Sequence, residues 1–533
     1  VGSEMCIRDR ICSHHAYQPI MNEIQKYPIG VQNFEKIIRN GFLYIDKTEF
    51  IYRLITKGEY YFLSRPRRFG KSLLLSTLEA FFRGKRELFK GLAIDSHDDI
   101  TWEEYPVLHL DLNAQDYTKD DSSLDQVLES NLAYWENIYG VQYTPDSFSL
   151  RFKRVIETIH STTGRQVVVL IDEYDKPLLQ NIGKSRRDRQ NRFRETLKGF
   201  YGVLKTCDPY IRFAFLTGVT KFGKVSVFSD LNNLRDLTME PEYNSICGIT
   251  ETELITNMRN GIELLAEKQR MSFEDTCARL KKSYDGYRFS EDEAEGIYNP
   301  FSLLNVMESR RFADYWFLTA TPTMLVELLR DRNIDLSRLD GATRTENELM
   351  GLDPEFSDPI PLLFQSGYLT IKGTRKMGER TLYRLGFPNS EVQNGMMEAL
   401  FPFYVNRNDG SEGAMLIYDC VSFLEEGDVE GFMNILKSLL AGVPYSETGD
   451  NGKVYEGRFR DVMYIVCKLM GMSVQCELHT GLGRIDMTVE TDSYIYVMEF
   501  KVDKSPETAL AQIEEKHYTD RYLADSRTVV KVG

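Results

Sequence analysis

The chain has 533 residues, of which 42% are hydrophobic and 27% charged, and its formal net charge is −15. This length predicts roughly three or four globular domains. The acidic balance disfavours a general nucleic-acid coat protein, and the apolar runs are too short to span a membrane. The eight cysteines stand singly, without a C-x-x-C pair, which indicates neither a zinc site nor a disulfide framework and favours a reducing cytoplasm.

The first 20 residues do not resemble part of a fold. The stretch Val1–Asp9 is similar to the translation of a sequencing adapter, so we expect residues 1–20 to be a non-native or disordered leader. Patterned sequence follows directly after Met21, which is the expected start of the native chain.

A phosphate-binding loop is predicted between residues 60 and 78. The strand-like run Tyr60–Leu63 precedes Ser64–Ser72, and a leucine-rich helix follows. In such a unit the loop N–H groups face phosphates, the lysine adds positive charge and the serine hydroxyl reaches a magnesium ion. Arg65 stands where the usual pattern has its first glycine, so an ordinary helix start is the alternative interpretation. The candidate nucleotide-binding residues are Arg67, Arg68, Phe69, Gly70, Lys71 and Ser72.

Two carboxylates follow a second predicted strand. The unbroken aliphatic run Val167–Ile171 is typical of a buried strand in a parallel sheet, and it ends in Asp172 and Glu173. Carboxylates at that position need a cationic partner, and a magnesium ion held by Ser72 and Asp172 would supply it. Glu173 would then polarise the attacking water. The alternative is an acidic turn after a core strand.

Residues 21–245 alternate strand-like and helix-like segments, as expected of a P-loop ATPase domain. Tyr105–Leu112 is a further predicted strand, and Ile211–Leu216 is another. The second ends at Thr217, which is either a sensor of the terminal phosphate or an ordinary strand-end residue. The basic run Lys184–Lys198 has three interpretations: it supplies an arginine finger, it contacts a polynucleotide, or it is a solvated helix face. A finger supplied in trans would require a homo-oligomer.

Two smaller regions come next. Residues 246–345 are predicted to be a helical lid, in which Thr250 caps one helix. In residues 346–410 a helix ends at Gly367, and a hairpin is predicted from Tyr368–Ile371 and Thr381–Leu385. A helix followed by a two-stranded wing predicts a winged-helix-like module, which either binds DNA or serves as a structural lid.

Residues 411–533 contain a second set of candidate catalytic residues. Two strands are predicted as a hairpin, from Gly483 to Val489 and from Tyr494 to Val502. Residues two apart in a strand share a face, so Glu499 and Lys501 project together and Asp486 can face them. Two carboxylates beside a lysine suit phosphodiester hydrolysis with Mg²⁺ or Mn²⁺. The alternative is an exposed hairpin with a cross-strand ion pair. Further candidates are Glu456 as a metal ligand and Gln512 as a substrate contact.

Several motifs together resemble the bacterial AAA-ATPase-like family: Tyr44–Thr48, Ser64–Ser72, Leu170–Asp175 and Tyr284–Tyr287. The tail, with Asp486, Glu499, Lys501 and Gln512, resembles the PD-(D/E)XK nuclease-superfamily domain fused to such proteins. The resemblance implies an α/β fold, in which a P-loop NTPase parallel sheet with a helical and winged-helix lid precedes a restriction-endonuclease-like α/β domain. A loop without the first glycine is typical of this family.

The sequence therefore predicts a cytoplasmic bacterial protein that binds and hydrolyses ATP with Mg²⁺. Its nucleotide state is expected to gate the nuclease-like domain, whose partner is a nucleic acid, DNA more than RNA. The alternative is a nucleotide-dependent switch or scaffold in which the nuclease fold is not catalytic. A third arrangement, an active ATPase with a decayed nuclease domain, is disfavoured because Asp486, Glu499 and Lys501 are all present.

Overall fold

The computed structural model describes residues 25–222, 233–291, 295–317, 325–326, 328–329, 336, 339–352, 358–405, 410–440, 461–469, 472–480, 483–501 and 504–533. The predictions for residues 1–20 and for Glu456 fall outside these residues.

A five-stranded parallel sheet forms the centre of the first domain. Its strands lie in the order β2-β3-β4-β1-β5, and each neighbouring pair is parallel. β3 is buried along its whole length, as its aliphatic sequence predicts. Because β4 lies between β1 and β3, the carboxyl ends of these three strands share one edge of the sheet. The strands are β1 (Tyr60–Ser64), β2 (Val107–Asp111), β3 (Val167–Asp172), β4 (Ile211–Gly218) and β5 (Arg235–Asp236).

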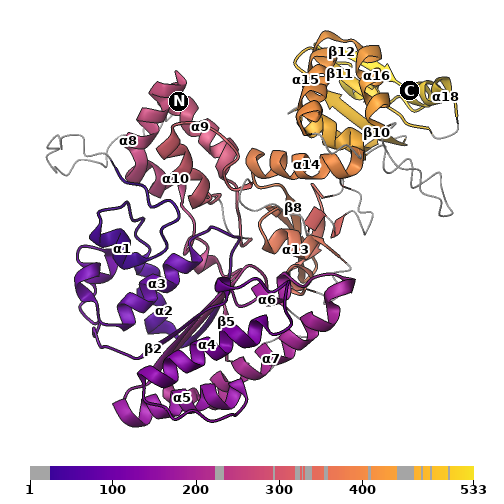
Figure 1. Cartoon of the computed structure of the whole chain (residues 1–533). Coiled ribbons are helices and arrows are strands. Elements are labelled where there is room, and N and C mark those ends of the chain that lie inside the picture. Colours follow the sequence, from indigo (N-terminus) through magenta and orange to yellow (C-terminus); the bar gives the residue numbers. More distant parts are fainter. Residues whose placement is uncertain are drawn as a thin grey trace, which may run out of the picture.

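Helices cover both faces of this sheet (Figure 1). On one face α3 packs against β2, β3 and β4 with α1 beside it, and on the other α5 packs against β3 with α4 and α7 beside it. Phe152 of α5 and Phe200 of α7 stack with 4.4 Å between their ring centroids. The helices are α1 (Phe34–Arg39), α2 (Thr48–Lys57), α3 (Lys71–Phe82), α4 (Ser123–Ile138), α5 (Phe148–Thr163), α6 (Lys176–Leu179) and α7 (Arg187–Thr206).

The predicted helical region follows the sheet. α8 begins with a capping box, because Thr250 Oγ1 accepts the Glu253 N–H and the Glu253 carboxylate accepts the Thr250 N–H. Asn299 caps α10 by accepting the N–H groups of Phe301 and Ser302. The three helices pack against one another and are α8 (Glu251–Gln269), α9 (Phe273–Tyr284) and α10 (Pro300–Ser309).

A helix and hairpin come next, as predicted, and we name residues 343–386 the hairpin module. Its antiparallel sheet has the order β6-β8-β7, and its strands extend further than the sequence indicates. α14 lies between the hairpin module and the C-terminal domain (Figure 1). The elements are β6 (Thr343–Thr345), α12 (Glu346–Met350), α13 (Ile360–Gln365), β7 (Thr370–Met377), β8 (Arg380–Gly386) and α14 (Ser390–Val405).

The C-terminal domain has a separate mixed sheet in the order β12-β11-β10-β9, in which only β11 and β12 are parallel among the described strands. Sequence patterning did not predict β9. Helices α15 (Gly410–Glu426), α16 (Val429–Leu440) and α18 (Pro506–Glu515) and helical residues 461–469 accompany this sheet, whose strands are β9 (Ser473–Thr480), β10 (Gly483–Glu490), β11 (Tyr494–Met498) and β12 (Thr528–Val532).

One strand prediction is wrong. β11 ends at Met498, so Glu499 and Lys501 follow the strand instead of lying within it. The β10–β11 ladder stops there because the Phe500 N–H donates to the Asp486 side chain and not to a strand carbonyl. Among the described helices, none combines the length and the apolar character needed to cross a bilayer.

Candidate functional site

The predicted phosphate-binding loop connects β1 to α3. Gly70 caps α3 with φ 97°, a left-handed conformation that glycine adopts without steric cost. The Lys71 side chain is only 3% exposed, and its Nζ donates to the carbonyl oxygens of Arg65 (3.1 Å) and Pro66 (3.3 Å). The loop therefore curves around a buried ammonium group at the start of the helix.

Arg65, which replaces the first glycine of the usual pattern, holds the loop to its surroundings. Its side chain is fully buried, and its guanidinium donates to the carbonyl oxygens of Ser64 (2.9 Å), Thr238 (2.8 Å) and Tyr243 (3.0 Å). The guanidinium carbon also lies 4.1 Å from the centroid of the Phe289 ring. These contacts fix the loop to segments that follow β5 and α9.

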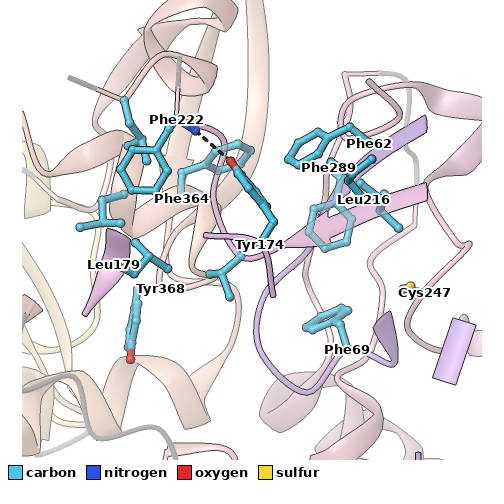
Figure 2. Close-up of a cluster of buried hydrophobic side chains, with 14 of the residues drawn as sticks. Phe62, Phe69, Tyr174, Leu179, Leu216, Phe222, Cys247, Phe289, Phe364 and Tyr368 are labelled. Atoms are coloured by element: carbon cyan, nitrogen blue, oxygen red, sulfur yellow. Dashed lines mark hydrogen bonds between the residues drawn. The ribbon is translucent and has the colours of Figure 1, made fainter. Parts of the chain in front are cut away.

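The Tyr284–Tyr287 motif supports the same loop. Phe69 is buried, and its ring meets those of Tyr287 and Phe289 edge-on, with centroid distances of 4.8 Å and 5.7 Å. Figure 2 shows Phe69 and Phe289 in this cluster. The side chain of Phe69 thus packs against the aromatic residues that follow α9 and anchors the loop from below the phosphate-facing backbone.

Two further contacts come from beyond α10. The indole Nε1–H of Trp316 donates to the carbonyl oxygen of Arg67 at 3.0 Å. Gly367, with φ 88°, packs so closely on Pro66 that a Cβ at this glycine would lie 2.7 Å from the proline ring. The loop therefore touches the segment before the hairpin module through the Arg67 carbonyl, and the module itself through the Pro66 ring.

The two predicted carboxylates lie beside the loop. Glu173 Oε1 is 3.3 Å from Lys71 Nζ, and the Ser72 hydroxyl hydrogen-bonds to Asp172. Burial, and then the charge of Glu173, raise the pKa of Asp172 to about 6, although Ser72 and Lys71 act in the opposite direction. Glu173 has φ 52°, a strained conformation for a residue with a side chain. The structure thus brings Lys71, Ser72, Asp172 and Glu173 together.

Thr217 is fully buried near the end of β4. Its hydroxyl has no hydrogen-bond partner within the described part of the chain. A buried hydroxyl without a partner costs about 1–3 kcal/mol, which a ligand oxygen or a water would recover. The next residues are held differently, because the Asp175 carboxylate accepts the N–H groups of Val219 and Thr220.

Tyr174 and Gln365 hold the segment that follows β4. Its hydroxyl accepts the Phe222 N–H at 3.2 Å, and Figure 2 shows this bond beside the buried ring of Phe364. The Lys221 N–H donates to Gln365 Oε1 at 2.6 Å. The segment after β4 is therefore bonded at two points. Phe222 is bonded to Tyr174, which follows β3, and Lys221 is bonded to α13.

Arginines occur at two places near this site. Arg67 and Arg68 are exposed on the loop, and the Arg68 guanidinium carbon lies 4.1 Å from the Phe301 ring centroid. Desolvation and the charge of Arg67 lower the pKa of Arg68. In the basic run, Arg189 and Arg192 pair with carboxylates next to and within α4, which favours the solvated-helix interpretation of that run.

The second candidate site lies where β10, the end of β11 and α18 meet. Asp486 Oδ2 accepts the Phe500 N–H at 2.9 Å. Glu499 Oε1 accepts the Lys501 ammonium at 2.6 Å and the side-chain N–H of Gln512. The structure therefore brings Asp486, Glu499, Lys501 and Gln512 together, although Gln512 bonds to the candidate ligand and was predicted to contact a substrate.

Glu499 is arranged as a metal ligand would be. It is 2% exposed, and its Oε2 has no hydrogen-bond partner within the described residues. Burial raises the pKa of Glu499, the charge of Asp486 adds to this effect, and the Lys501 bond opposes it. A hard cation at Oε2 would remove the cost of this buried oxygen.

The oxygen donors fit a magnesium ion better than a softer metal. No set of three or more His, Cys, Asp or Glu within the described ranges gathers closely enough to hold a metal ion. Magnesium does not need such a set, because it retains several waters and takes other ligands from substrate phosphates. Two carboxylates, Asp486 and Glu499, therefore suffice on the protein side.

Sequence reasoning missed the residues that support the phosphate loop and the segment after β4. Trp316 and Gln365 lie far from the loop in sequence and carry no motif of their own. The aromatic cluster at Tyr284–Tyr287 was the available signal, since a motif so rich in aromatic residues suggests a packing role.

Comparisons with known proteins agree with this arrangement. A family model described as a predicted AAA-ATPase matches residues 28–228, and one described as the PD-(D/E)XK nuclease superfamily matches residues 454–533. A protein of Azotobacter chroococcum mcd 1, described as "Uncharacterized protein in vnfD 5'region", is 36% identical over 521 residues, which cover 96% of each chain. The chain therefore belongs to the AAA-ATPase-like family and carries a C-terminal domain of the PD-(D/E)XK nuclease superfamily.

Proposed function

We propose that this protein binds and hydrolyses ATP, and that its nucleotide state gates a magnesium-dependent nuclease domain acting on nucleic-acid phosphodiesters. The observation that carries the proposal is the presence of two separate clusters of charged side chains in one chain. Lys71 lies with Glu173 beside the phosphate loop, and Lys501 lies with Glu499 beside β10. Each cluster pairs a cation with a partly or fully buried carboxylate, as is common at functional sites.

In the ATPase half, Lys71 would exchange its bonds to loop carbonyls for bonds to phosphate oxygens. Ser72 and Asp172 would hold a magnesium ion, which neutralises phosphate charge when bound. Glu173 is the candidate base for the attacking water, and its distance of 3.3 Å from Lys71 supports this role. The buried hydroxyl of Thr217 is the candidate donor to the terminal phosphate.

In the nuclease half, Asp486 and Glu499 would hold Mg²⁺ or Mn²⁺. A bound ion supplies Lewis-acid chemistry at the scissile phosphate. Lys501, held by Glu499 Oε1, is positioned to donate to a phosphate oxygen as charge develops there. Gln512 and Lys501 both donate to Glu499 Oε1, so Glu499 Oε2 would be available to the ion.

Gating is supported by the contacts of the ATPase half with the hairpin module and with the segment before it. The loop carbonyl of Arg67 is bonded to Trp316, and the segment after β4 is bonded to Gln365. A bound phosphate chain would move both partners, and α14 extends from the hairpin module towards the C-terminal domain (Figure 1). This path gives the nucleotide site a physical route to the nuclease half.

The test uses the purified chain with ATP, Mg²⁺ and single- or double-stranded DNA or RNA. We expect phosphate release that Lys71→Ala abolishes, and cleavage that Asp486→Ala and Lys501→Ala abolish while phosphate release continues. Matched controls are Lys205→Ala on α7 and Asp492→Ala at the exposed turn of the same hairpin. Equal cleavage by the wild type and Asp486→Ala, or no cleavage of any nucleic acid, would contradict the nuclease half.

One observation favours the alternative of a nucleotide-dependent switch. Arg65 stands where the usual motif has its first glycine, and this departure favours nucleotide binding without turnover. Nucleotide binding by calorimetry without phosphate release would support that role.

For either function we propose the same domain organisation. It consists of an ATPase domain at 21–245, a helical lid at 246–345, a winged-helix-like module at 346–410 and a nuclease-like domain at 411–533. We also propose that the protein is cytoplasmic and that it forms homo-oligomers if an arginine finger acts in trans.

A further inference from the structure

The hairpin formed by β7 and β8 is basic, although the chain as a whole is acidic. Between Thr370 and Gly386 the sequence contains five lysine or arginine residues and one carboxylate, Glu379, whereas the whole chain has a net charge of −15. A positive patch on an acidic protein indicates a polyanionic partner, because the rest of the surface repels such a partner.

The strand register places three of these cations on one face of the sheet. Arg380 and Arg384 stand four residues apart on β8 and therefore project to the same side. Arg375 of β7 lies opposite Leu382, which stands between them, so it projects to that side as well. A Cβ at Gly373 would lie 3.8 Å from a guanidinium nitrogen of Arg384, so this arginine lies across β7. We name Arg375, Arg380 and Arg384 the arginine face.

The other side of the same sheet is buried. Ile371, Tyr383 and Leu385 project to that side and belong to the hydrophobic core. The three residues of the arginine face are exposed. Since the module packs through its apolar side, the arginine face is the side that a ligand can reach.

The arginine face has no counter-charge of its own within the described part of the chain. None of its guanidinium groups forms an ion pair or a hydrogen bond there. By contrast, Arg344 on the buried side pairs with Asp358 at 2.7 Å, and two arginines of the α7 basic run pair with carboxylates. Bonds from Thr345 lower the pKa of Glu348, and the charges of Arg344 and Arg380 contribute, but this carboxylate is engaged at the cap of α12.

The base of the arginine face adjoins the C-terminal domain. Asp340 lies over Gly386 at the end of β8, because a Cβ at that glycine would lie 2.6 Å from Asp340 Oδ1. The Asp340 carboxylate also faces Lys468 of the C-terminal domain, with 4.0 Å between the charged atoms. The Leu336 N–H donates to Asp461 of the same helical segment at 3.1 Å. A polyanion on the arginine face would therefore be held beside the domain that carries the candidate nuclease residues.

We propose that the arginine face binds the phosphate backbone of the nucleic acid on which the nuclease-like domain acts, without reading its base sequence. This inference rests on the proposed function, because it names the surface that holds the substrate of the second site. Of the two roles that the sequence leaves open for this module, nucleic-acid binding and a structural lid, it favours nucleic-acid binding. The site is the open face of the sheet and not a helix.

The spacing of the arginine face suits a phosphate backbone. Arg380 and Arg384 are roughly 13 Å apart along the strand, which spans about four phosphates in one strand of a duplex. Each guanidinium can therefore contact a different phosphate and donate two bonds to it. Contacts to phosphate fix the position of a nucleic acid but carry no sequence information.

The experiment titrates the full chain, in EDTA so that nothing is cleaved, into labelled single- and double-stranded DNA and RNA and follows the fluorescence anisotropy. The test variant combines Arg375→Ala, Arg380→Ala and Arg384→Ala. We expect it to bind about tenfold or more weakly than the wild type near physiological salt. The slope of log affinity against log salt concentration should fall by about 2–3, because three phosphate contacts are lost.

The matched control removes the same charge elsewhere on the surface. It combines Arg39→Ala, Arg165→Ala and Arg259→Ala, which replace exposed arginines that are ion-paired with carboxylates. We expect its affinity to remain within about threefold of the wild type, since these positions are screened and already paired. Equal affinities of the test variant and the control would overturn the inference and leave the proposed function intact.

Two other outcomes would also overturn the inference. If polyglutamate of similar length binds to the wild type as tightly as DNA and RNA, the face serves an acidic protein partner. If the wild type binds no nucleic acid, the inference fails, and the cleavage assay with Mg²⁺ then decides whether the nuclease half of the proposed function fails with it.

Cleavage kinetics separate this surface from the catalytic residues. With Mg²⁺ we expect the test variant to raise KM about tenfold or more at a kcat within about twofold of the wild type, because the face holds substrate away from the reacting phosphate. Asp486→Ala should show the reverse, with binding retained and cleavage lost. A test variant that loses kcat at an unchanged KM would overturn the inference.

A conservative variant tests whether charge is the cause. The combination of Arg375→Lys, Arg380→Lys and Arg384→Lys keeps the positive charge, so we expect affinity within about tenfold of the wild type. A lysine variant as weak as the alanine variant would overturn the assignment to phosphate contacts. If the triple alanine variant does not fold, the three single alanine variants decide, each with a salt slope lower by about 0.7–0.9 if the inference holds and unchanged if it does not.

Discussion

The guanidinium carbon of Arg65 lies 4.1 Å from the centroid of the Phe289 ring, which fastens the phosphate loop to the segment after α9. We expect Arg65→Gly, which restores the glycine of the usual motif, to destabilise the protein by about 3–5 kcal/mol. The reason is that the buried carbonyl oxygens of Thr238 and Tyr243 lose their donors. Urea unfolding measures the difference in the free energy of unfolding.

The matched control for that experiment is Arg67→Gly. Arg67 is exposed on the same loop, and its contact with Trp316 is made by the backbone. We expect Arg67→Gly to change stability by less than about 1 kcal/mol. A stability of Arg65→Gly equal to that of the control would contradict the structural role of Arg65.

Trp316→Phe tests the link between the loop and the rest of the chain. The variant keeps an aromatic ring beside Tyr368 but removes the indole N–H that donates to Arg67. We expect ATP affinity to change by less than about tenfold and the ATP dependence of DNA cleavage to be largely lost. Cleavage rates with and without ATP measure this coupling.

Trp135→Phe is the control, since Trp135 is also buried and packs against Phe152 of the ATPase domain. Both variants leave a cavity, but only one removes a bond to the phosphate loop. The coupling hypothesis is wrong if the two variants retain the same response to ATP.

Gln512→Leu tests the positioning of Glu499. The variant removes one of the two donors to Glu499 Oε1, so the carboxylate is less well oriented towards the ion. We expect Mn²⁺ affinity and DNA cleavage to fall by about 10–100-fold, with ATP hydrolysis unchanged. Gln475→Leu, on an exposed position of β9, is the control. If Mn²⁺ binds equally to both variants, Gln512 does not orient the ligand.

Glu391 makes the stability of the protein depend on pH. It is buried at the start of α14, where it accepts the Ser302 hydroxyl and the Trp316 N–H, both at 2.7 Å. Burial is the largest cause that raises the pKa of Glu391 to about 8 from its ordinary value of 4.5, and the nearby charge of Asp314 adds to it. The folded state thus keeps a proton that the unfolded chain releases.

This difference in protonation determines how the stability changes with pH. The contribution of Glu391 to stability is most favourable below pH 4.5 and is lost as the pH rises towards 8, with a difference on the order of 3 kcal/mol at pH 7. Glu391→Gln imitates the protonated carboxyl, so we expect it to raise the unfolding free energy at pH 7–8 and to flatten its pH dependence. The control is Glu267→Gln, because Glu267 is exposed on α8. A pH profile of Glu391→Gln that matches the wild type would show that Glu391 is ionised in the folded protein.

Sequence reasoning predicted those parts of the fold that depend on residues close together in the sequence. The run Val167–Ile171 is aliphatic because both faces of β3 are covered, and Thr250 with Glu253 forms the cap that its spacing indicates. The end of β11 could not be predicted, since it depends on a bond between Phe500 and Asp486 of the neighbouring strand.

The candidate sites were predicted to the same extent and for the same reason. Lys71, Asp172 and Glu173 follow strands that the sequence reveals, and parallel strands bring their ends together. The role of Arg65 depends on acceptors at Thr238 and Tyr243, which no local pattern connects to the loop. Contacts of this kind depend on tertiary packing and have no local sequence period.

The close packing of Gly367 on Pro66 also determines when the loop can gain its contacts during synthesis of the chain. During synthesis the loop leaves the ribosome long before the glycine that it must pack against. At roughly 5–20 residues per second, the interval is about 15–60 s. A first domain released without its later partners would carry an incompletely supported loop, so the loop gains its full set of contacts only when translation has passed the hairpin module.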